Sequence, residues 1–505
     1  MNKITLDFNC SRGTIAPELY GHFTEHIGGV FYDGLWVGEE SKVENIHGFR
    51  KAMVDSLKRI APPVLRWPGG CFAETYDWRD GIGPRASRPR RINWWYYCDG
   101  RVESNHVGTH EFMRLCRLTG AQPYVAANMT SISPMHVRDW IEYCNLPAGA
   151  TSLADERAQN GDEAPFNVRY WGIGNENWGG GGQMTPERCA DEFIRFTTVC
   201  RPLTPLNLRF IMCGANGHDL DWTRRMLRQW SGRPWHETPA WGMSVHYYTN
   251  ALSGKDDVNF DEAGWYDELF RADYMRRIVD DHRAVMDQYD PERKLKIVVD
   301  EWGNWHIDGT GPSKGSNLFE QQSNMRDAQV AAITLNFFNN RCDVVGMTNV
   351  AQLCNNLHSL YLASGEHMVE TPNYHVFHMF QGHKGGRHIE AKVEGRVLES
   401  GKYEPLELLS ASASVKNGVL TLTMANLDLT SAADICLFGH NGSIAGEGSL
   451  RILYHREPMT CNTFDNPYAI HPTEQKIALS EGSRITLPAA SIAVLTVALL
   501  DGRAE

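Results

Sequence analysis

The 505-residue chain has a formal net charge of −12, with 42% hydrophobic and 22% charged residues, as in ordinary globular proteins. The acidic balance argues against nucleic acid or an anionic membrane as the main partner. The length suggests two domains, and the twelve scattered cysteines are typical of thiols in a reducing compartment. Neither a signal peptide nor an apolar run of transmembrane length is predicted, so we expect a cytoplasmic protein.

The first predicted element is a strand over residues 3–8. Its apolar residues Ile4, Leu6 and Phe8 alternate with polar ones, which indicates one buried face. This strand precedes the repeating region and needs a pairing partner. We therefore expect residues 1–15 to join a β-sandwich formed by the C-terminal part of the chain.

From residue 20 to residue 355, short apolar runs alternate with amphipathic helices. Each run ends in a polar residue, and these residues are Glu25, Arg66, Asn128, Glu176, Asn216, His246, Glu301 and Gln352. Successive ends lie 30 to 62 residues apart, which is enough chain for a strand, a helix and a loop. Eight such units predict a (β/α)8 TIM barrel over residues 16–383. Its active site would lie at the strand ends.

Helices are predicted between these runs. The spacing of apolar residues indicates helices over residues 48–60 and 275–286. Thr185 followed by Pro186 is typical of a helix start, because a threonine hydroxyl caps the first turn and proline fits the first helical position.

After residue 383 the hydrophobic period changes to two. Asn417-Gly418 separates two alternating runs, which predicts a β-hairpin. A further strand is predicted over residues 485–499. We expect residues 384–505 to form a small, jelly-roll-like β-sandwich.

The most informative motif is WGIGNENW at residues 171–178, an apolar run that ends in Asn175-Glu176. A glycosidic oxygen leaves readily only if it is protonated as the bond breaks, and a glutamic acid can supply that proton. A strand-end glutamate taken alone is more often structural. The position in the barrel and the preceding Asn175, which could bind the neighbouring sugar hydroxyl, favour a catalytic role for Glu176.

A second apolar run ends in Asp300-Glu301. Glu301 lies 125 residues after Glu176, about three βα units, which places the pair on strands four and seven. Carboxylates about 5–5.5 Å apart act with retention, and a gap of about 6.5–9.5 Å gives inversion. The sequence does not set this gap. Strand alternation also leaves the choice between Asp300 and Glu301 open, because Glu301 shares its strand face with Val299.

Seven segments, taken together and in order, resemble the α-L-arabinofuranosidases of glycoside hydrolase family 51 over nearly the whole chain. They are YGHFTEH (20–26), LRWPGG (65–70), WRDGIGP (78–84), RPRR (88–91), GNENWG (174–179), DEW (300–302) and AQL (351–353). Only GNENWG is specific by itself. The resemblance implies a retaining, exo-acting enzyme that releases terminal α-L-arabinofuranosyl residues from oligosaccharides of arabinan or arabinoxylan. It implies a homo-oligomer, with a hexamer as one option, and a reaction that needs no cofactor and no metal.

The resemblance also implies roles for individual residues. Glu176 would be the general acid/base and Glu301 the nucleophile. The side chains expected around the sugar or the catalytic pair are Glu25, Asn175, Trp178, His246, Tyr248 and Gln352. Within this set, Tyr248 would bond the nucleophile or the ring oxygen, and His246 would orient the acid/base. Without the resemblance, His246 could equally be a buried core histidine.

Cys71 marks a departure from the family pattern. Where this chain has Gly69-Gly70-Cys71-Phe72, family members often carry asparagine in place of the cysteine. A thiol is a weak hydrogen-bond donor, so Cys71 would line the sugar subsite with a weaker contact. The alternative is a plain buried thiol.

Two other functions stay open at this point. A β-glucan or β-xylan hydrolase could use the same barrel and the same two glutamates. A non-catalytic carbohydrate-binding barrel would be expected to lack one of them, and both are present.

Overall fold

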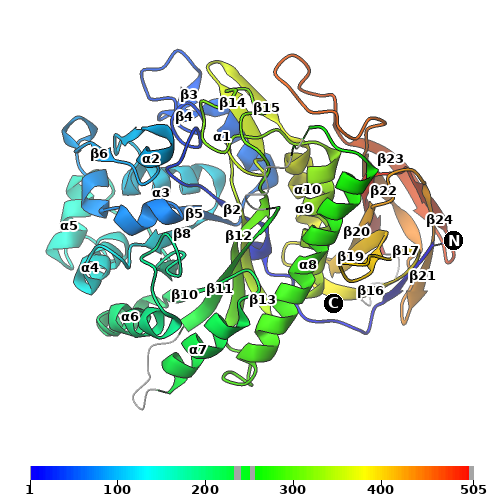
Figure 1. Cartoon of the computed structure of the whole chain (residues 1–505), viewed down its shortest axis with the longest axis horizontal. Helices are drawn as coiled ribbons and strands as arrows, with labels where there is room; N and C mark the ends of the chain where they lie inside the picture. Colours follow the sequence, from blue (N-terminus) through cyan, green and yellow to red (C-terminus); the bar gives the residue numbers. More distant parts are fainter. Residues whose placement is uncertain (1, 233–239, 251–255, 257, 500–505) are drawn as a thin grey trace.

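The computed structural model describes residues 2–232, 240–250, 256 and 258–499. Figure 1 shows a barrel beside a smaller β-rich part, with α8, α9 and α10 between them. Within these described ranges, every helix is too short or too polar to cross a membrane.

Eight parallel strands close into a barrel within the described chain. In chain order they are β2 (Gly21–Phe23), β5 (Val64–Trp67), β8 (Gln122–Ala127), β9 (Tyr170–Ile173), β10 (Arg209–Asn216), β11 (Ala240–Thr249), β12 (Lys296–Asn304) and β13 (Val345–Val350). Each strand pairs with the next in this order, and β13 pairs with β2. The eight predicted runs are therefore the eight barrel strands, and the predicted TIM barrel is confirmed.

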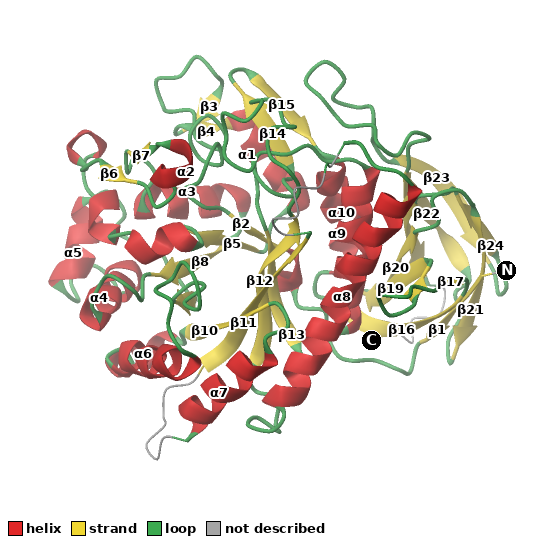
Figure 2. Cartoon of the chain, in the orientation of Figure 1, coloured by secondary structure: helices red, strands yellow, loops and turns green. Residues whose placement is uncertain are grey.

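Helices surround the barrel (Figure 2). They are α1 (Lys51–Ile60), α2 (Tyr96–Asp99), α3 (Thr109–Thr119), α4 (Pro134–Asn145), α5 (Ser152–Gln159), α6 (Pro186–Thr198), α7 (Leu220–Ser231), α8 (Glu262–Met286), α9 (Met325–Asn340) and α10 (Pro372–Phe380). The Thr185 hydroxyl accepts the backbone N–H of Arg188, so the predicted start of α6 is confirmed.

Two predicted helix ranges need correction. The helix expected over residues 48–60 begins at Lys51, because β4 (Phe49–Arg50) pairs with β3 (Asn45–Ile46) immediately before it. The helix expected over residues 275–286 is the second half of the longer α8.

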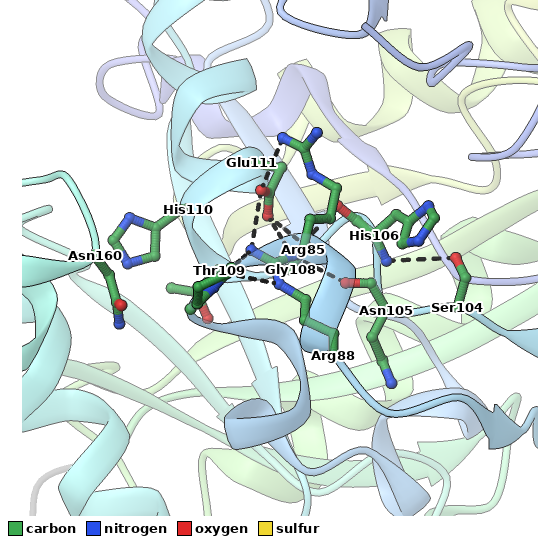
Figure 3. A network of polar contacts seen from close by, with 12 residues as sticks. Arg85, Arg88, Ser104, Asn105, His106, Gly108, Thr109, His110, Glu111 and Asn160 are labelled. Carbon is green, nitrogen blue, oxygen red and sulfur yellow. Dashed lines mark hydrogen bonds and ion pairs between the residues drawn. The ribbon is translucent and has the colours of Figure 1, made fainter. Parts of the chain in front are cut away.

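A long excursion connects β5 to α3 on the side where the strands end. It contains η2 (Cys71–Thr75), η3 (Trp78–Gly81), η4 (Arg85–Ser87), β6 (Arg91–Ile92), α2 and β7 (Val102–Glu103). Arg88 holds its outer part to the start of α3, donating to Glu111 at 2.9 and 3.1 Å, while Glu111 also accepts the N–H of Gly108 (Figure 3). Charge-assisted bonds of this kind fix a segment that has little regular structure of its own.

The β-rich part is a nine-stranded sheet that folds over one core. Its order is β23 (Thr473–Leu479), β22 (Gly446–Leu453), β25 (Ser491–Ala498), β20 (Val419–Asn426), β19 (Leu409–Lys416), β16 (Arg387–Glu394), β1 (Asn2–Asp7), β21 (Ala433–His440) and β24 (Arg484–Leu487). The start of β16 pairs with β19 and its end with β1, so β16 links the two halves.

The N-terminal strand joins this sheet as predicted, with Ile4 and Leu6 fully buried in its core. The hairpin between β19 and β20 also forms, and both turn residues, Asn417 and Gly418, have a positive φ. We propose to keep the expected domain boundaries at residues 15/16 and 383/384, since η6 (Gln381–His383) ends just before β16.

The prediction of a single strand over residues 485–499 is wrong. It is two strands, β24 and β25, which pair with different neighbours. Pro488 lacks a backbone N–H and Ala490 has a φ of 50°, so the chain turns between them and cannot continue one ladder.

Three short pairs complete the described elements. They are β14 (Tyr361–Ser364) with β15 (His367–Glu370), β17 (Val397–Leu398) with β18 (Leu406–Glu407), and β6 with β7. η1 (Pro17–Tyr20) and η5 (Arg201–Leu206) are short 3₁₀ turns.

Candidate active site

The carboxyl ends of the barrel strands bring most of the predicted residues together. Glu176 follows β9, the fourth barrel strand in chain order, and Glu301 lies near the end of β12, the seventh. His246 and Tyr248 come from β11, and Glu25 and Gln352 follow β2 and β13. The predicted placement of the two glutamates on strands four and seven is therefore correct.

Glu301 is buried and held by two donors. Arg66 Nη1 donates to its Oε1 at 2.8 Å, and the Tyr248 hydroxyl donates to its Oε2 at 2.7 Å. Gly70 leaves room for this carboxylate, because a Cβ at that position would lie only 2.8 Å from Glu301 Oε1. The carboxylate is thus fixed in one orientation before any ligand binds.

Asp300 lies beside Glu301 but has a different set of partners. It accepts from the Tyr124 hydroxyl at 2.7 Å, and its Oδ1 lies 3.0 Å from His246 Nε2. The pairing register of β12 shifts near Asp300 against both of its neighbours. Against β11 the shift lies just before His246, and against β13 it lies between Val299 and Trp302. Such an irregularity lets two consecutive residues contact the same histidine, which regular alternation would prevent.

His246 connects the two glutamates. Its Nδ1 lies 2.8 Å from Glu176 Oε1 and 3.5 Å from Glu301 Oε2. Burial by itself would lower the pKa of His246, but the charge of Glu301 and the bonds to Asp300 and Glu176 raise it well above its usual value. His246 is therefore a buried histidine whose two ring nitrogens contact carboxylates of the site, which favours the predicted site role over a plain core histidine.

The two catalytic candidates are close together. One carboxylate oxygen of Glu176, one of Glu301 and a ring nitrogen of His246 all lie within 4.8 Å of one another. At least one pair of oxygens from the two carboxylates is thus closer than 4.8 Å, which fits the retaining arrangement of about 5–5.5 Å better than the inverting one of about 6.5–9.5 Å. Glu176 has a φ of 44°, an uncommon backbone conformation for a residue with a side chain.

Glu25 and Gln352 form a reciprocal pair at the edge of the site. Gln352 Nε2 donates to Glu25 Oε2 at 3.1 Å, and the Glu25 N–H donates to Gln352 Oε1 at 3.0 Å. Trp95 Nε1 donates to Glu25 Oε1. Burial and the nearby charge of Glu301 raise the pKa of Glu25 to about 7.

Asn175 and Trp178 lie within two residues of Glu176 in the chain, and Cys71 contacts it. Asn175 accepts from Arg66 at 2.6 Å, while its own Nδ2 is buried without a hydrogen-bond partner among the described residues and so can serve a ligand. Cys71 Sγ lies 3.8 Å from Glu176 Oε2 and is partly exposed, so this thiol contacts the site and is not simply buried. Trp178 is half-buried and packs against the barrel core.

Two family models match the chain. Residues 56–259 match the α-L-arabinofuranosidase 1 domain, and residues 300–491 match the α-L-arabinofuranosidase C-terminal domain. An intracellular exo-α-L-arabinofuranosidase of Bacteroides ovatus is 35% identical over 97% of this chain and 95% of its own length. The chain belongs to the α-L-arabinofuranosidases of glycoside hydrolase family 51.

Solved structures agree with this family 51 assignment. The family 51 arabinofuranosidase of Xanthomonas axonopodis pv. citri is 36% identical, with a TM-score of 0.91 over 98% of this chain and all of that one. The Thermotoga maritima α-L-arabinofuranosidase, crystallised with arabinose, is 27% identical with a TM-score of 0.87, covering 99% of this chain and all of that one. A bifunctional glucanase-xylanase from a metagenome library shares the fold alone, at 13% identity and a TM-score of 0.62.

Sequence reasoning missed several residues of this family 51 site. Arg66 was noted as a strand end, yet it joins Glu301 to Asn175 and is balanced by Asp300 at 3.5 Å. Glu74, from η2, accepts the N–H of Asn175 at 2.5 Å. The strand-end position could have suggested Arg66, but nothing in the sequence pattern indicates Glu74, which comes from an irregular loop.

Proposed function

We propose that this protein is a retaining exo-α-L-arabinofuranosidase that releases terminal arabinofuranosyl residues from arabinan- or arabinoxylan-derived oligosaccharides. The family membership and the named activity of the Bacteroides ovatus relative support the reaction. The observation that supports the retaining mechanism is the closeness of Glu176 and Glu301, since one carboxylate oxygen of each lies within 4.8 Å of one of the other.

The reaction proceeds in two displacements. Glu301 attacks the anomeric carbon while Glu176 protonates the departing glycosidic oxygen. Water activated by Glu176 then hydrolyses the glycosyl-enzyme. Because the charge of Glu301 helps to raise the pKa of His246, ester formation at Glu301 lowers that pKa during the second step.

The surrounding residues would bind the sugar. The free Nδ2 of Asn175 is placed to donate to the hydroxyl beside the anomeric carbon, a contact that strengthens in the transition state. The Glu25–Gln352 pair presents carboxylate and amide groups to further hydroxyls, and Trp178 offers an apolar ring.

Substituting the two glutamates tests the mechanism. For Glu176→Ala we expect kcat to fall by about 10²–10⁴-fold on substrates with poor leaving groups, and far less on activated aryl arabinofuranosides, which need little protonation. Glu301→Ala should lose turnover on both classes. Equal losses on both classes for Glu176→Ala, or wild-type turnover for Glu301→Ala, would contradict the assigned roles.

A substrate panel tests the specificity. Aryl arabinofuranoside, xyloside and cellobioside substrates are compared at equal concentration, and we expect turnover of the arabinofuranoside. The rival β-glucan or β-xylan hydrolase would prefer the other two, and the glucanase-xylanase structure supports that rival by a likeness of fold alone. Binding without turnover would favour the non-catalytic barrel.

We further propose that the protein acts inside the cell. The name of the Bacteroides ovatus relative supports this, and no disulfide forms among the described cysteines. The expected homo-oligomer stays a prediction, which light scattering on the purified protein checks.

A further inference from the structure

Glu74 is a fully buried carboxylate outside the residues assigned to catalysis or sugar binding. Its Oε1 accepts the backbone N–H of Asn175 at 2.5 Å and a proton of Asn177 Nδ2 at 3.1 Å. Its Oε2 accepts the backbone N–H groups of Met129 and Thr130, each at 2.9 Å. Burial raises the pKa of Glu74, and the hydrogen bonds that it accepts oppose this shift. All four contacts come from donors, so both oxygens of Glu74 serve as acceptors.

The four donors belong to two neighbouring strand ends of the barrel. Oε1 of Glu74 holds the residues on either side of Glu176, in the loop after β9, whereas Oε2 holds the chain that follows β8. One side chain of η2 therefore joins the ends of two strands that pair with each other. Glu176 has a φ of 44°, and such a conformation persists only where the surrounding structure imposes it. Glu74 supplies that support from both sides.

The contact with Asn177 extends this support into the loop that follows Glu176. Asn177 Nδ2 donates to the carbonyl oxygen of Gly181 at 2.7 Å as well as to Glu74. The N–H of Gly181 in turn donates to the carbonyl oxygen of Glu176 at 3.0 Å. A Cβ at position 181 would lie 1.9 Å from the carbonyl oxygen of Asn175, so this tight turn requires glycine there. Glu74 is thus bonded to a closed turn that contains the acid/base.

We propose that Glu74 is a positioning residue for the acid/base, an inference that rests on the proposed role of Glu176. The carboxyl group of Glu176 lies 2.8 Å from His246 Nδ1 and is partly exposed, so its direction depends on where the backbone places it. A displacement of about 1 Å in a catalytic group can cost about 10²-fold in rate. Glu74 acts through the backbone and is not itself a catalytic residue.

Glu74→Gln removes this support with little change in size. An amide keeps one oxygen but presents an NH2 group in place of the other. Because each oxygen of Glu74 accepts from two donors, the NH2 group faces donors in either orientation. Buried donors that lose their acceptor cost more free energy than the hydrogen bond had contributed. We therefore expect the loop to shift and to move the carboxyl group of Glu176 out of place.

The test is the leaving-group dependence of kcat/KM, measured with an alkyl and a dinitrophenyl arabinofuranoside. The alkyl leaving group needs a proton from Glu176, and the dinitrophenyl group needs little protonation. For Glu74→Gln we expect kcat/KM to fall by about 10²-fold on the alkyl glycoside and by at least about tenfold less on the dinitrophenyl one. Unfolded protein lowers both values equally, so the ratio of the two reports on positioning alone. A wild-type ratio in Glu74→Gln would overturn the proposal.

Glu111 provides a matched control. It is also a buried glutamate that accepts a backbone N–H, that of Gly108 at the start of α3 (Figure 3). Glu111→Gln should lower the free energy of unfolding and leave the ratio of the two kcat/KM values as in the wild type. A ratio that changes as much in Glu111→Gln as in Glu74→Gln would show a general effect of losing a buried carboxylate, and the proposal would be wrong.

Asn177→Ala is used if Glu74→Gln does not fold. It removes one of the four contacts with Glu74, while the backbone N–H groups of Asn175, Met129 and Thr130 remain. We expect the ratio to change in the same direction as in Glu74→Gln and by a smaller factor. With Asn177→Ala as the deciding variant, an unchanged ratio contradicts the proposal.

Glu176→Ala separates this inference from the proposed function. An unchanged ratio in Glu176→Ala contradicts the acid role itself, whereas a changed ratio there with an unchanged one in Glu74→Gln contradicts the positioning role alone. Adding Glu74→Gln to Glu176→Ala should change the ratio no further, because residues that act as a unit are not additive. If the wild type cleaves a different glycoside, the same two leaving groups are compared on that sugar.

Discussion

Asp300 and Glu301 both carry carboxylates, so the residue type alone does not distinguish their roles. Their hydrogen-bond partners do. Glu301 is held by Arg66 and Tyr248, which leaves its carboxylate fixed and directed at the site. Asp300 is occupied by Tyr124 and His246 and so acts as a positioning residue. The irregular pairing of β12 allows both to reach His246, which explains why alternation could not choose between them.

Glu25 gives a pH dependence at the same scale. Burial and the charge of Glu301 raise its pKa from the ordinary 4.5 to about 7, so the folded state favours the protonated form. The stability that this provides is present below pH 4.5 and is lost as the pH rises towards 7. The shift corresponds to about 3 kcal/mol.

We therefore expect the free energy of unfolding of the wild type, relative to Glu25→Gln, to fall by about 3 kcal/mol between pH 4.5 and pH 7. Urea unfolding of both proteins across this range checks it. A constant difference between them would contradict the raised pKa. The two proteins should also differ by an amount that does not depend on pH, because Gln352 donates to Glu25 and would face a second amide in the variant. The raised pKa is tested only by the part of the difference that changes with pH.

The start of α6 illustrates what local sequence sets at the scale of an element. This helix follows the loop after Glu176, and Thr185 accepts the N–H of Arg188 in its first turn. Pro186 takes the first helical position, where its missing N–H has no helical partner to lose. The loop between Glu176 and α6 is thus fixed at its far end by a short-range interaction.

For Thr185→Ala we expect a loss of about 1 kcal/mol in the free energy of unfolding, since the first-turn N–H loses its acceptor. Thr185→Ser keeps a hydroxyl and should be close to the wild type. Denaturant unfolding measures both variants. A serine variant as unstable as the alanine variant would show that the methyl group, and not the cap, matters here.

At the scale of the whole molecule, α9 joins the barrel to the sandwich. Asn336 on this helix donates to Ser410 at 3.1 Å and accepts from the hydroxyls of Ser412 and Thr423 at 2.9 and 2.6 Å. Gln329 on the same helix donates to backbone oxygens of β20 and β25. If the sandwich unfolded alone, the buried polar groups of α9 would lose their hydrogen-bond partners. We therefore expect the barrel and the sandwich to unfold together.

Asn336→Ala should lower the free energy of unfolding by about 1–3 kcal/mol, because it removes buried hydrogen-bond partners. Differential scanning calorimetry should show one transition at a lower temperature. Two separate transitions, with only one of them shifted, would show that the barrel and the sandwich unfold independently.

The sequence by itself determined the order and type of most elements. Strand ends, the start of α6 and the Asn417-Gly418 hairpin depend on residues that are close along the chain, and such local preferences can be recognised without the fold. The predicted starts of α1 and α8 were wrong. The prediction also failed at residues 485–499, where the apolar pattern continues through a change of sheet partner, a choice made by distant strands. The resemblance supplied the two glutamates and most of their neighbours.

Only the tertiary structure decided how these residues act on one another. The separation of Glu176 and Glu301, the support of His246 by Asp300 and the bridge made by Arg66 join residues 54 to 235 positions apart. Cys71 is the clearest case, since its sequence position allowed either a buried thiol or a site residue, and its contact with Glu176 favours the second. Distances across a barrel follow from its closure, and closure is a property of all eight strands together.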